Sequence, residues 1–451
     1  MIKYYFMVIS KNNYKSTITA LWDITSKCNL QCLHCYNASK YFYSNRKYDL
    51  VFNYGVEKII QKISCLSVTH LHLLGGEPLL SPNIWDILKF SEKYNIAVSI
   101  NTNGTLLNSQ KISKLSKFKN LSQIVISLDG PNAKVNDEIR GKGTFKKVIK
   151  NIHNLIGEFQ NHKRNLVIAI NTVITEHNAN YLKEFPNIMK YLGIKHLLVS
   201  TLYDCGNANK NKMLGNKYFD RVISNLIKLL DISQNTKDIF VQFDAKPKLA
   251  TYINRLFGNK IVEVEPFKCG AVNEFIFIDS NGFIYPCGSI TQEIHNFKID
   301  YNLNIMDVGI GKEFSLNKIF NNFSKVKRNT HTTYCRKCEF INICSGICPL
   351  YYKKSPEDIP LECKTVDFFQ TKLFNSILSK SYIIINREKC KINNHIEKLI
   401  MKLIDDGDKV KEIINKLINN YKINGDILLN DVCGYISDLV VDGIIIEKIR
   451  R

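Results

Sequence analysis

Short apolar runs alternate with Lys-rich amphipathic stretches in the first half of this chain, and this alternation restricts the fold most. Six runs have strand length: Ala20–Thr25, His70–Leu74, Ala97–Asn101, Ile124–Leu128, Val167–Val173 and His196–Thr201. Helical patterns such as Ser81–Tyr94 and Gly143–Phe159 follow them. Strands that alternate with helices favour a parallel sheet. We therefore predict an α/β fold, a partial (β/α)6 TIM-like barrel over residues 16–235.

Polar motifs follow the first four of these runs. Cys28 comes after the first run, and Gly75-Gly76-Glu77-Pro78 after the second. Asn101-Thr102-Asn103-Gly104 follows the third, and Ser127-Leu128-Asp129-Gly130 ends the fourth. Chemistry in such barrels takes place at the C-terminal ends of the strands. The sequence therefore predicts that these motifs lie at the functional edge of the sheet.

Three cysteines stand in one short run, Cys28-Asn-Leu-Gln-Cys32-Leu-His-Cys35, with the spacing CxxxCxxC. Iron–sulfur clusters are normally held by four cysteine thiolates, so three would leave one iron open to a substrate or cofactor. Zinc motifs usually pair cysteines as CxxC and close the site with four ligands, so zinc fits this run less well. Three loop cysteines that are close by chance are the remaining alternative.

A second group of cysteines lies between positions 269 and 363. It consists of Cys269, Cys287, Cys335, Cys338, Cys344, Cys348 and Cys363. Regular spacing in an intracellular chain favours metal over disulfides, and a pair of structural zinc sites is one form this could take. Cys65, Cys205, Cys390 and Cys433 fit neither set. We interpret them as small buried residues, with Cys205 a possible exception because it follows a predicted strand.

Length and composition allow two or three domains in a globular chain of 451 residues. No run of 18 apolar residues occurs, so we expect no membrane span, and the N-terminus lacks a cleavage site for a secretory signal. The cysteine usage indicates a reducing, cytoplasmic setting. The formal net charge of +21 would suit nucleic acid. Without an Arg-rich stripe we expect no nucleic acid partner, although a basic protein with zinc knuckles remains an alternative.

With its CxxxCxxC run and the motifs after the next strands, the chain resembles the radical SAM family. In that family the three cysteines bind a [4Fe–4S] cluster whose open iron chelates S-adenosylmethionine (SAM). The resemblance implies that Cys28, Cys32 and Cys35 bind such a cluster. Its electron would cleave SAM into methionine and a 5′-deoxyadenosyl radical, which abstracts hydrogen from a substrate C–H bond. We assign no catalytic residue beyond the cluster ligands.

Gly75-Gly76-Glu77-Pro78 resembles the GGEP motif of this family, which accepts hydrogen bonds from the ammonium group of SAM. Asn103 and Ser127 could equally cap turns, and Arg140 could equally be a solvated loop residue. His34 is expected to be a packing residue. The SAM contacts implied by the resemblance are Gly75, Gly76, Glu77, Pro78, Asn103, Ser127, Asp129, Arg140, Asn171 and Tyr36.

The later cysteines resemble the SPASM extension of radical SAM enzymes, which carries two auxiliary [4Fe–4S] clusters. We expect this domain over residues 260–372, with Phe275–Ile278 and Phe283–Tyr285 paired as a β-hairpin. The resemblance assigns Cys335, Cys338, Cys344 and Cys363 to an outer cluster. It assigns Cys269, Cys287 and Cys348 to an inner cluster that lacks a fourth thiolate. Three clusters are expected in total.

Two SPASM branches modify peptides. Anaerobic sulfatase-maturing enzymes carry an Asp beside the second auxiliary cysteine, where this chain has Gly288, and a glycine cannot act as a general base. The resemblance therefore favours the branch that forms thioether or related crosslinks in a ribosomal precursor peptide, with flavodoxin or ferredoxin as electron donor. A sulfatase-maturing enzyme and a non-catalytic iron–sulfur scaffold or electron carrier are the alternatives.

Residues 380–451 are predicted to form a third, winged-helix-like unit. Tyr382–Asn386 and Gly443–Ile449 have strand patterns, and Asn394–Asp405, Asp408–Tyr421 and Ile427–Asp442 have helical apolar spacing. This order resembles the recognition element of enzymes that modify ribosomally made peptides (RiPPs). It implies a leader-peptide-binding unit, and a helical tail that only caps the protein is the alternative.

Overall fold

A computed structural model of the chain divides into two compact units. Unit 1 comprises residues 1–244, 269–330 and 348–354, and unit 2 comprises residues 245–268, 331–347 and 355–451. The structure describes residues 18–37, 55–162, 164–202, 206–211, 218–234, 236, 239–243, 246–258, 261–262, 264, 269–288, 303–309, 331–332, 334–342, 344–346, 363, 366–367, 369, 373, 380, 382–384, 395–406, 408–421, 425–441 and 444–447.

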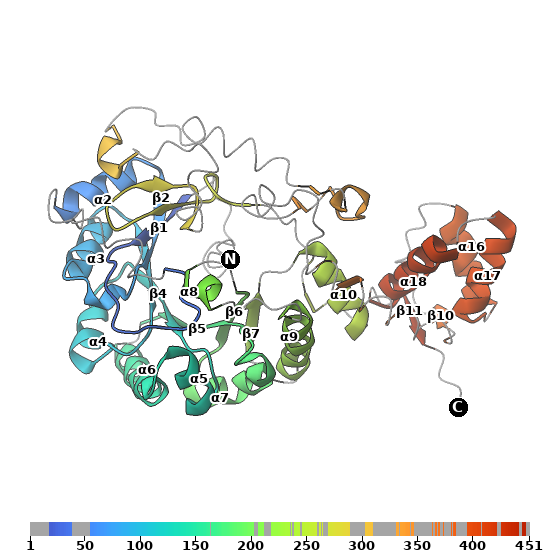
Figure 1. The fold of residues 1–451 in the computed structure, drawn as a ribbon, viewed down its shortest axis with the longest axis horizontal. Coiled ribbons are helices and arrows are strands. Elements are labelled where there is room, and N and C mark those ends of the chain that lie inside the picture. The colour runs from blue at the N-terminus through green and yellow to red at the C-terminus, as the bar shows by residue number, and fades with distance from the viewer. Residues whose placement is uncertain are drawn as a thin grey trace. The chain divides into compact units, whose positions relative to one another are not determined.

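A nine-stranded sheet forms the centre of unit 1, in the order β7-β6-β5-β4-β3-β2-β1-β8-β9 (Figure 1). Neighbouring strands from β7 to β8 are parallel, and β9 runs antiparallel to β8. The strands are β1 (Ile18–Asp23), β2 (Val68–Leu74), β3 (Ala97–Thr102), β4 (Leu121–Ser127), β5 (Val167–Val173), β6 (His196–Ser200), β7 (Phe240–Phe243), β8 (Phe275–Ile278) and β9 (Ile284–Tyr285).

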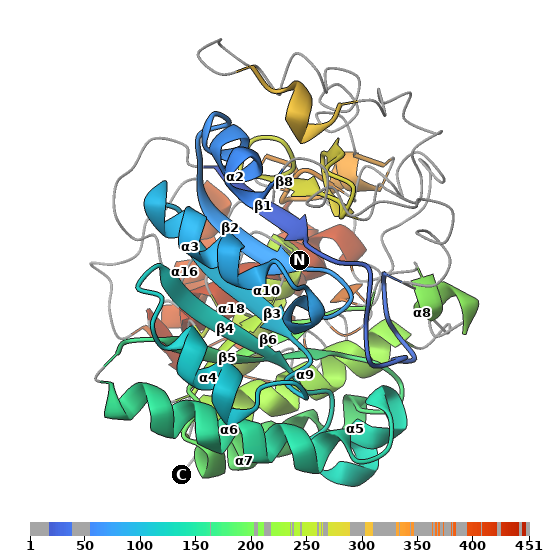
Figure 2. The same ribbon diagram turned by 90° about the vertical axis from the view of Figure 1, so that its left-hand side faces the viewer.

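Helices separate the parallel strands, and α3, α4 and α6 cover one face of the sheet (Figure 2). Apolar residues at helical spacing make these faces, as Val148, Ile152, Leu155 and Phe159 do on α6. The helices of unit 1 are α2 (Val56–Ser64), α3 (Ile84–Lys93), α4 (Ser109–Leu115), α5 (Ala133–Arg140), α6 (Thr144–Asn161), α7 (Phe185–Leu192), α8 (Gly206–Lys210) and α9 (Tyr218–Gln234). Short 3-10 helices are η2 (Pro78–Leu80), η3 (Ala179–Glu184) and η5 (Ile305–Asp307).

The opposite face of the sheet is buried but partly polar. Side chains alternate between faces along a strand, so His70 and His72 share one face of β2. His70 Nε2 lies 2.8 Å from Ser99 Oγ on β3, and the His72 ring also contacts that hydroxyl. Because buried polar groups require partners, this hydrogen-bonded group fixes the register between β2 and β3.

The six predicted strands correspond to β1–β6, and the structure confirms the partial barrel of parallel strands. It also adds a strand at each edge of those six. Strand β7 extends the sheet beyond β6, and β8 pairs in parallel with β1. The predicted hairpin is confirmed, with Phe277 opposite Tyr285. Its first strand therefore also pairs the edge of β1, whose backbone groups would otherwise lack partners.

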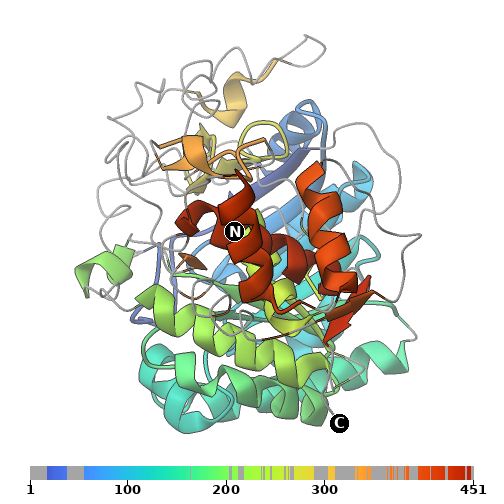
Figure 3. The same ribbon diagram turned by 90° about the vertical axis from the view of Figure 1, so that its right-hand side faces the viewer.

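Unit 2 contains α10 (Pro247–Phe257), the short 3-10 helix η6 (Cys335–Lys337) and a C-terminal group of elements drawn in red in Figure 3. That group consists of β10 (Tyr382–Ile384), α16 (His395–Asp405), α17 (Val410–Tyr421), α18 (Gly425–Val441) and β11 (Ile445–Glu447). Strands β10 and β11 pair antiparallel. These elements follow the predicted order of strand, three helices and strand.

The C-terminal group has its own apolar core. Ile404, Ile413, Leu417 and Ile436 are nearly fully buried within it. Helix α10 joins this group through α18, because Arg255 donates from Nε and an Nη atom to the two oxygens of Asp438 at 2.7 and 2.8 Å. Among the described helices of the whole chain, none combines the length and apolar character needed to cross a membrane.

Candidate functional site

The cysteine loop follows β1 and is partly buried. Leu30 N–H donates to Cys28 Sγ at 3.4 Å, and Cys35 N–H donates to the Cys32 carbonyl at 3.3 Å. Burial raises the pKa of the Cys28 and Cys32 thiols, while Arg140 opposes this effect at Cys32. Cys28 interacts electrostatically with both other cysteines. The loop thus brings the three predicted cluster ligands into one place.

Gly75 and Gly76 lie directly against this loop. Gly76 N–H donates to the Thr25 carbonyl at 2.8 Å, and Glu77 N–H donates to the Lys27 carbonyl at 2.8 Å. A Cβ atom at position 76 would lie 2.2 Å from the Lys27 oxygen, and Gly75 has a φ of +136°. Only glycine permits this backbone approach. The two glycines therefore seat the cysteine loop, a role that the sequence did not reveal.

The Glu77 side chain is fully buried and engaged within the chain. Its Oε1 accepts hydrogen bonds from Leu79 N–H at 3.1 Å and Thr102 Oγ1 at 2.7 Å, and its Oε2 accepts one from Asn103 N–H at 2.8 Å. Burial raises the pKa of the Glu77 carboxyl although these three donors lower it. Pro78 begins η2 immediately afterwards. Glu77 thus joins the ends of two strands, and a contact with SAM stays a prediction.

Asn103 connects the third motif to the cysteine loop. Its Nδ2 donates to Asn29 Oδ1 at 2.9 Å, and its Oδ1 accepts from Thr105 N–H at 2.9 Å. Asn29 Nδ2 in turn donates to Thr105 Oγ1 at 2.9 Å. Asn103 therefore caps its own turn, one of the two roles considered from the sequence, and it also holds the loop. A contact of Asn103 with SAM stays a prediction.

Asp129 is fully buried between the side chains of His34 and Arg140. Its Oδ2 lies 2.6 Å from His34 Nε2 and 2.6 Å from Arg140 Nε. Burial alone would raise the pKa of the Asp129 carboxyl, but Arg140 and then His34 lower it strongly. The expectation that His34 is only a packing residue is wrong, because its ring donates to an ionised carboxylate. Arg140 is likewise no solvated loop residue, since it lies buried at the end of α5.

Ser127, Asn171 and Tyr36 lie near the same edge. Ser127 at the end of β4 pairs in register with Asn171 on β5. Asn171 Oδ1 accepts a 3.1 Å hydrogen bond from Ser200 Oγ on β6. Tyr36 follows the cysteine loop and is 40% exposed. Contacts of these three residues with SAM stay predictions.

Helix α8 also holds the cysteine loop, and sequence analysis missed it. Asn207 Nδ2 donates to the Cys32 carbonyl at 3.0 Å, and Asn211 Nδ2 donates to the Leu33 carbonyl at 2.8 Å. The residues in each pair are more than 170 positions apart. A five-residue helix carries no periodic signal, so nothing local in the sequence could reveal this contact.

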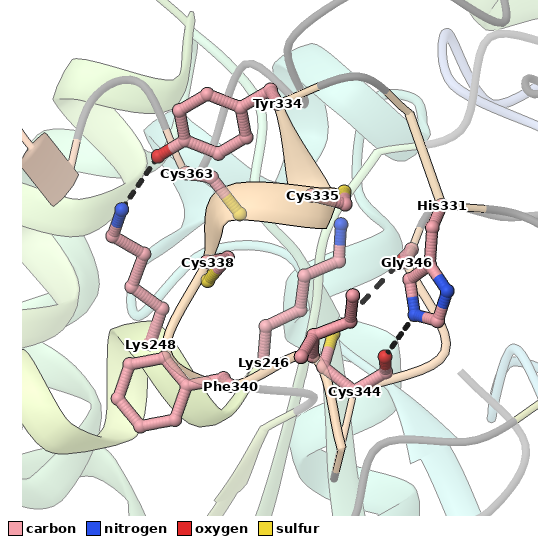
Figure 4. Close-up of a pocket in the computed structure, with 11 residues that line it drawn as sticks. Lys246, Lys248, His331, Tyr334, Cys335, Cys338, Phe340, Cys344, Gly346 and Cys363 are labelled. Carbon is pink, nitrogen blue, oxygen red and sulfur yellow. Dashed lines mark hydrogen bonds between the residues drawn. The ribbon is translucent and has the colours of Figure 1, made fainter.

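Four auxiliary cysteines line one pocket in unit 2, together with Lys246 and Lys248 (Figure 4). They are Cys335, Cys338, Cys344 and Cys363, the set assigned to the outer cluster. Thr332 Oγ1 donates to Cys335 Sγ at 3.3 Å. Burial raises the pKa of the Cys338 and Cys344 thiols. Residues far apart in sequence therefore bring four thiols to one pocket.

Lys248, Tyr334 and Asp367 connect three segments beside this pocket. Lys248 Nζ donates to Tyr334 OH at 2.5 Å, and both groups contact the Asp367 carboxylate. Burial and then Asp367 raise the pKa of the Tyr334 hydroxyl. Because Tyr334 precedes Cys335, these contacts hold that cysteine relative to α10.

The inner set is only partly described. Cys269 and Cys287 flank the β8–β9 hairpin in sequence, and both are partly buried. Cys348 lies outside the described residues, as do Cys205 and Cys390. Gly288 follows Cys287, and a Cβ atom there would lie 3.2 Å from the Phe277 ring. A larger side chain at this position therefore requires the ring to shift.

The donor set fits an iron–sulfur cluster at Cys28, Cys32 and Cys35. N–H groups of Leu30 and Arg140 point to the sulfurs of Cys28 and Cys32, and such hydrogen bonds are typical of cluster sites. Among the described residues, no three His, Cys, Asp or Glu side chains are arranged to hold a single metal ion.

Comparisons with known proteins identify the domain that carries this site. Residues 22–187 match the radical SAM superfamily. Mycofactocin maturase MftC of Mycobacterium ulcerans (strain Agy99) is 30% identical over 177 residues, which cover 39% of this chain and 45% of that protein. The chain thus spans less than half the length of this relative.

Two solved structures share the fold. Streptococcus suis SuiB bound to precursor peptide SuiA has a TM-score of 0.56 and 20% identity, covering 77% of this chain and 74% of that one. The structure of anSMEcpe with bound AdoMet and Kp18Cys peptide has a TM-score of 0.58 and 20% identity, covering 80% of this chain and 99% of that one. These two structures show the shared fold, and the family match shows that residues 22–187 of this chain form a radical SAM domain.

Proposed function

We propose that this protein is a radical SAM enzyme that abstracts hydrogen from a ribosomal precursor peptide to form a thioether or related crosslink. The observation that carries the radical chemistry is that three separate segments of the chain contact the cysteine loop. Gly76, Asn103 and Arg140 each contact that loop directly. Gly76 and Asn103 follow β2 and β3, and Arg140 ends α5, the helix after β4. The chemistry of such barrels takes place at this edge, where the strands end.

The cluster and SAM would supply the radical that breaks the substrate C–H bond. The residues of this chain hold and orient them. Cys28, Cys32 and Cys35 would bind three irons, and Gly75–Pro78, Asn103, Ser127, Asp129, Arg140, Asn171 and Tyr36 would surround SAM. Burial of Glu77 and Asp129 keeps the charged groups of this edge in fixed positions.

A peptide substrate is supported by the names and titles of similar proteins. MftC is named a maturase, SuiB is described with its precursor peptide SuiA, and anSMEcpe with a peptide. The auxiliary clusters would serve the substrate step or its electron flow. The outer cluster would bind Cys335, Cys338, Cys344 and Cys363, and the inner one Cys269, Cys287 and Cys348. A cytoplasmic flavodoxin or ferredoxin would supply electrons.

The C-terminal group of unit 2 would bind the leader part of the precursor. Its described sheet pairs β10 with β11, and each of these strands forms one edge of that sheet. An extended peptide can add to such an edge through backbone hydrogen bonds. Affinity would then depend on backbone pairing and apolar contacts more than on salt.

Sulfatase maturation, the other peptide-modifying SPASM branch, is the second candidate. The structure of anSMEcpe, which shares the fold over 99% of that chain, also holds a peptide. Gly288 counts against sulfatase maturation because glycine offers no base. The two products differ in mass. A thioether crosslink removes a pair of hydrogen atoms from the peptide, whereas formylglycine made from cysteine also loses the sulfur.

The first experiment measures 5′-deoxyadenosine after anaerobic reconstitution and reduction with dithionite in the presence of SAM. Its formation supports radical chemistry, and its absence leaves the non-catalytic scaffold as the better account. Short Cys-containing peptides encoded beside the gene are then added, and their masses are measured. A peptide that loses hydrogen only when SAM and reductant are present supports the crosslink. The same peptide with sulfur lost supports sulfatase-type oxidation.

A further inference from the structure

We propose that Arg140, anchored by Asp129, is a positioning residue that raises the reduction potential of the cluster held by Cys28, Cys32 and Cys35. This role rests on one part of the proposed function, namely that a cluster forms at Cys28, Cys32 and Cys35. It differs from the expected contact between Arg140 and SAM, since it acts on the cluster before SAM binds.

The guanidinium of Arg140 lies against the cluster loop. An Nη atom approaches Cys32 Sγ at 3.9 Å, and the side chain is 7% exposed. Leu33 N–H donates to the Ile139 carbonyl at 3.0 Å, so the backbone of the loop also pairs with the last turn of α5. Two adjacent residues at the end of α5 therefore contact two adjacent residues of the loop.

Asp129 keeps Arg140 in this place because it is itself fixed on every side. Its Oδ1 accepts from Val173 N–H at 2.9 Å, and its own N–H donates to Asn136 Oδ1 at 3.0 Å. Its carbonyl accepts from Asn178 Nδ2 at 2.9 Å. The carboxylate cannot follow a moving guanidinium. The 2.6 Å ion pair between Asp129 Oδ2 and Arg140 Nε holds the guanidinium beside Cys32.

His34 completes the arrangement from the loop side. Its ring donates to the same Asp129 oxygen that pairs with Arg140, at 2.6 Å. Because His34 precedes Cys35, this bond fixes the loop segment between Cys32 and Cys35. One buried carboxylate therefore sets both the loop and the cation beside it.

A buried cation at a ligand sulfur favours the reduced cluster. Reduction adds one electron, and hence one negative charge, to a group already ligated by thiolates. Electrostatic attraction is strong where water is excluded, and hydrogen bonds to the sulfurs raise the potential of such clusters. Loss of the Arg140 charge should therefore lower the potential.

The test is an EPR-monitored redox titration of the reconstituted full-length enzyme without SAM or peptide. The signal of the SAM-site cluster is obtained by subtracting the spectrum of the Cys28→Ala/Cys32→Ala/Cys35→Ala variant. Arg140→Gln should raise the ratio of oxidised to reduced cluster about tenfold at a fixed potential, a shift of about 59 mV for one electron. Arg140→Lys, which keeps the charge, should give a smaller shift.

Asp129→Asn tests the anchor through a double-mutant cycle. If Asp129 positions Arg140, the shift caused by Arg140→Gln will be smaller in the Asp129→Asn background than in the parent. Two controls should leave the potential unchanged. Asp137→Asn removes a charge from the same helix, and Arg164→Gln removes an arginine that pairs with carbonyls before β4.

Several results would overturn this role. In one such result, Arg140→Gln leaves the reduction potential measured without SAM unchanged but weakens SAM binding. Arg140 would then be a SAM ligand only. Another is loss of the cluster iron in both Arg140 variants, which would make the residue structural. If the shifts in potential caused by Arg140→Gln and Asp129→Asn are additive, Asp129 does not position Arg140. A parent enzyme without the SAM-site signal would overturn the proposed function as well.

Discussion

The backbone N–H of Asn207 donates a hydrogen bond of 2.9 Å to the carbonyl oxygen of Cys35. This bond places α8 against the end of the cysteine loop. Gly206, the first residue of α8, has a φ of +57°, and a Cβ atom there would lie 2.4 Å from the carbonyl oxygens of Cys35 and Tyr36. The contact between α8 and the loop therefore requires glycine at this position.

Gly206→Ala should consequently displace α8 and loosen the cysteine loop. We expect faster amide hydrogen exchange across residues 32–36 and faster iron release to a chelator. Gly193→Ala is the matched control, because Gly193 also has a positive φ of +68° but no atom within 4 Å of its added Cβ. It should cost only backbone strain, about 1–3 kcal/mol, without changing iron release. Equal exchange rates in both variants would argue against docking by α8.

Gly76→Ala should prevent the cysteine loop from seating. The added Cβ would lie 2.2 Å from the Lys27 oxygen and 2.9 Å from Cys28 N, so the backbone must move where the first ligand stands. We expect loss of about four iron atoms per chain, measured by iron and sulfide analysis, with little change in circular dichroism. Gly157→Ala on α6, with no atom within 4 Å, should keep full iron and be neutral or slightly stabilising.

Replacement of Cys28, Cys32 and Cys35 by Ala should remove one of the three predicted [4Fe–4S] clusters. The iron content should therefore fall by about four of about 12 atoms per chain. The replacement should also abolish 5′-deoxyadenosine formation, because the cluster that would cleave SAM is then lost. Cys65→Ala is the control, since Cys65 belongs to neither cysteine set, and it should keep both iron and cleavage. SAM cleavage that survives the triple change would falsify the assignment.

Acid should destabilise the barrel through two buried histidines. Burial lowers the pKa of His70 to about 4, and burial together with the His70 charge lowers the pKa of His72 to about 3. The unfolded chain binds these protons below pH 6.5, whereas the folded chain excludes them. The free energy of unfolding should therefore fall as pH decreases from about 6.5 to about 4, by about 1.4 kcal/mol per pH unit for each excluded proton.

The measurement is denaturant unfolding at several pH values, compared between the parent and His72→Asn. Asparagine can keep a hydrogen bond to Ser99 but does not titrate, so the slope in the acid range should become shallower. His162→Asn, which replaces a half-exposed histidine on the surface, should leave the slope unchanged. An identical slope in parent and His72→Asn would exclude His72 as a contributor.

Truncation after Lys380 should leave SAM cleavage in place and weaken binding of the precursor peptide. The truncation removes β10, β11 and the helices between them, but it also removes Asp438, the partner of Arg255 on α10. Asp438→Asn is therefore the matched control, because it breaks that ion pair and keeps the peptide-binding strands. Peptide affinity, measured by calorimetry, should fall in the truncated protein only. Equal modification of full-length precursor by truncated and intact enzyme would make the C-terminal group a cap.

The sequence by itself determined the elements and the cluster motif. Strands β1–β6 and helices α16–α18 follow from local apolar periodicity, which depends on neighbours along the chain. The resemblance of the run that holds Cys28, Cys32 and Cys35 to that of radical SAM enzymes indicated the domain without any structure. The pairing of Phe277 with Tyr285 was likewise visible, because a hairpin joins residues that are close in sequence.

Only the tertiary structure decided how these pieces meet. His34 and Asp129 are 95 positions apart, and Arg140 is 108 positions from Cys32. Strand β8 pairs with β1 although more than 250 residues separate them. Such contacts depend on how strands close into a barrel, and no local pattern encodes that. The buried carboxylate of Asp129 became part of the site because folding placed a loop, a helix end and a strand end around it.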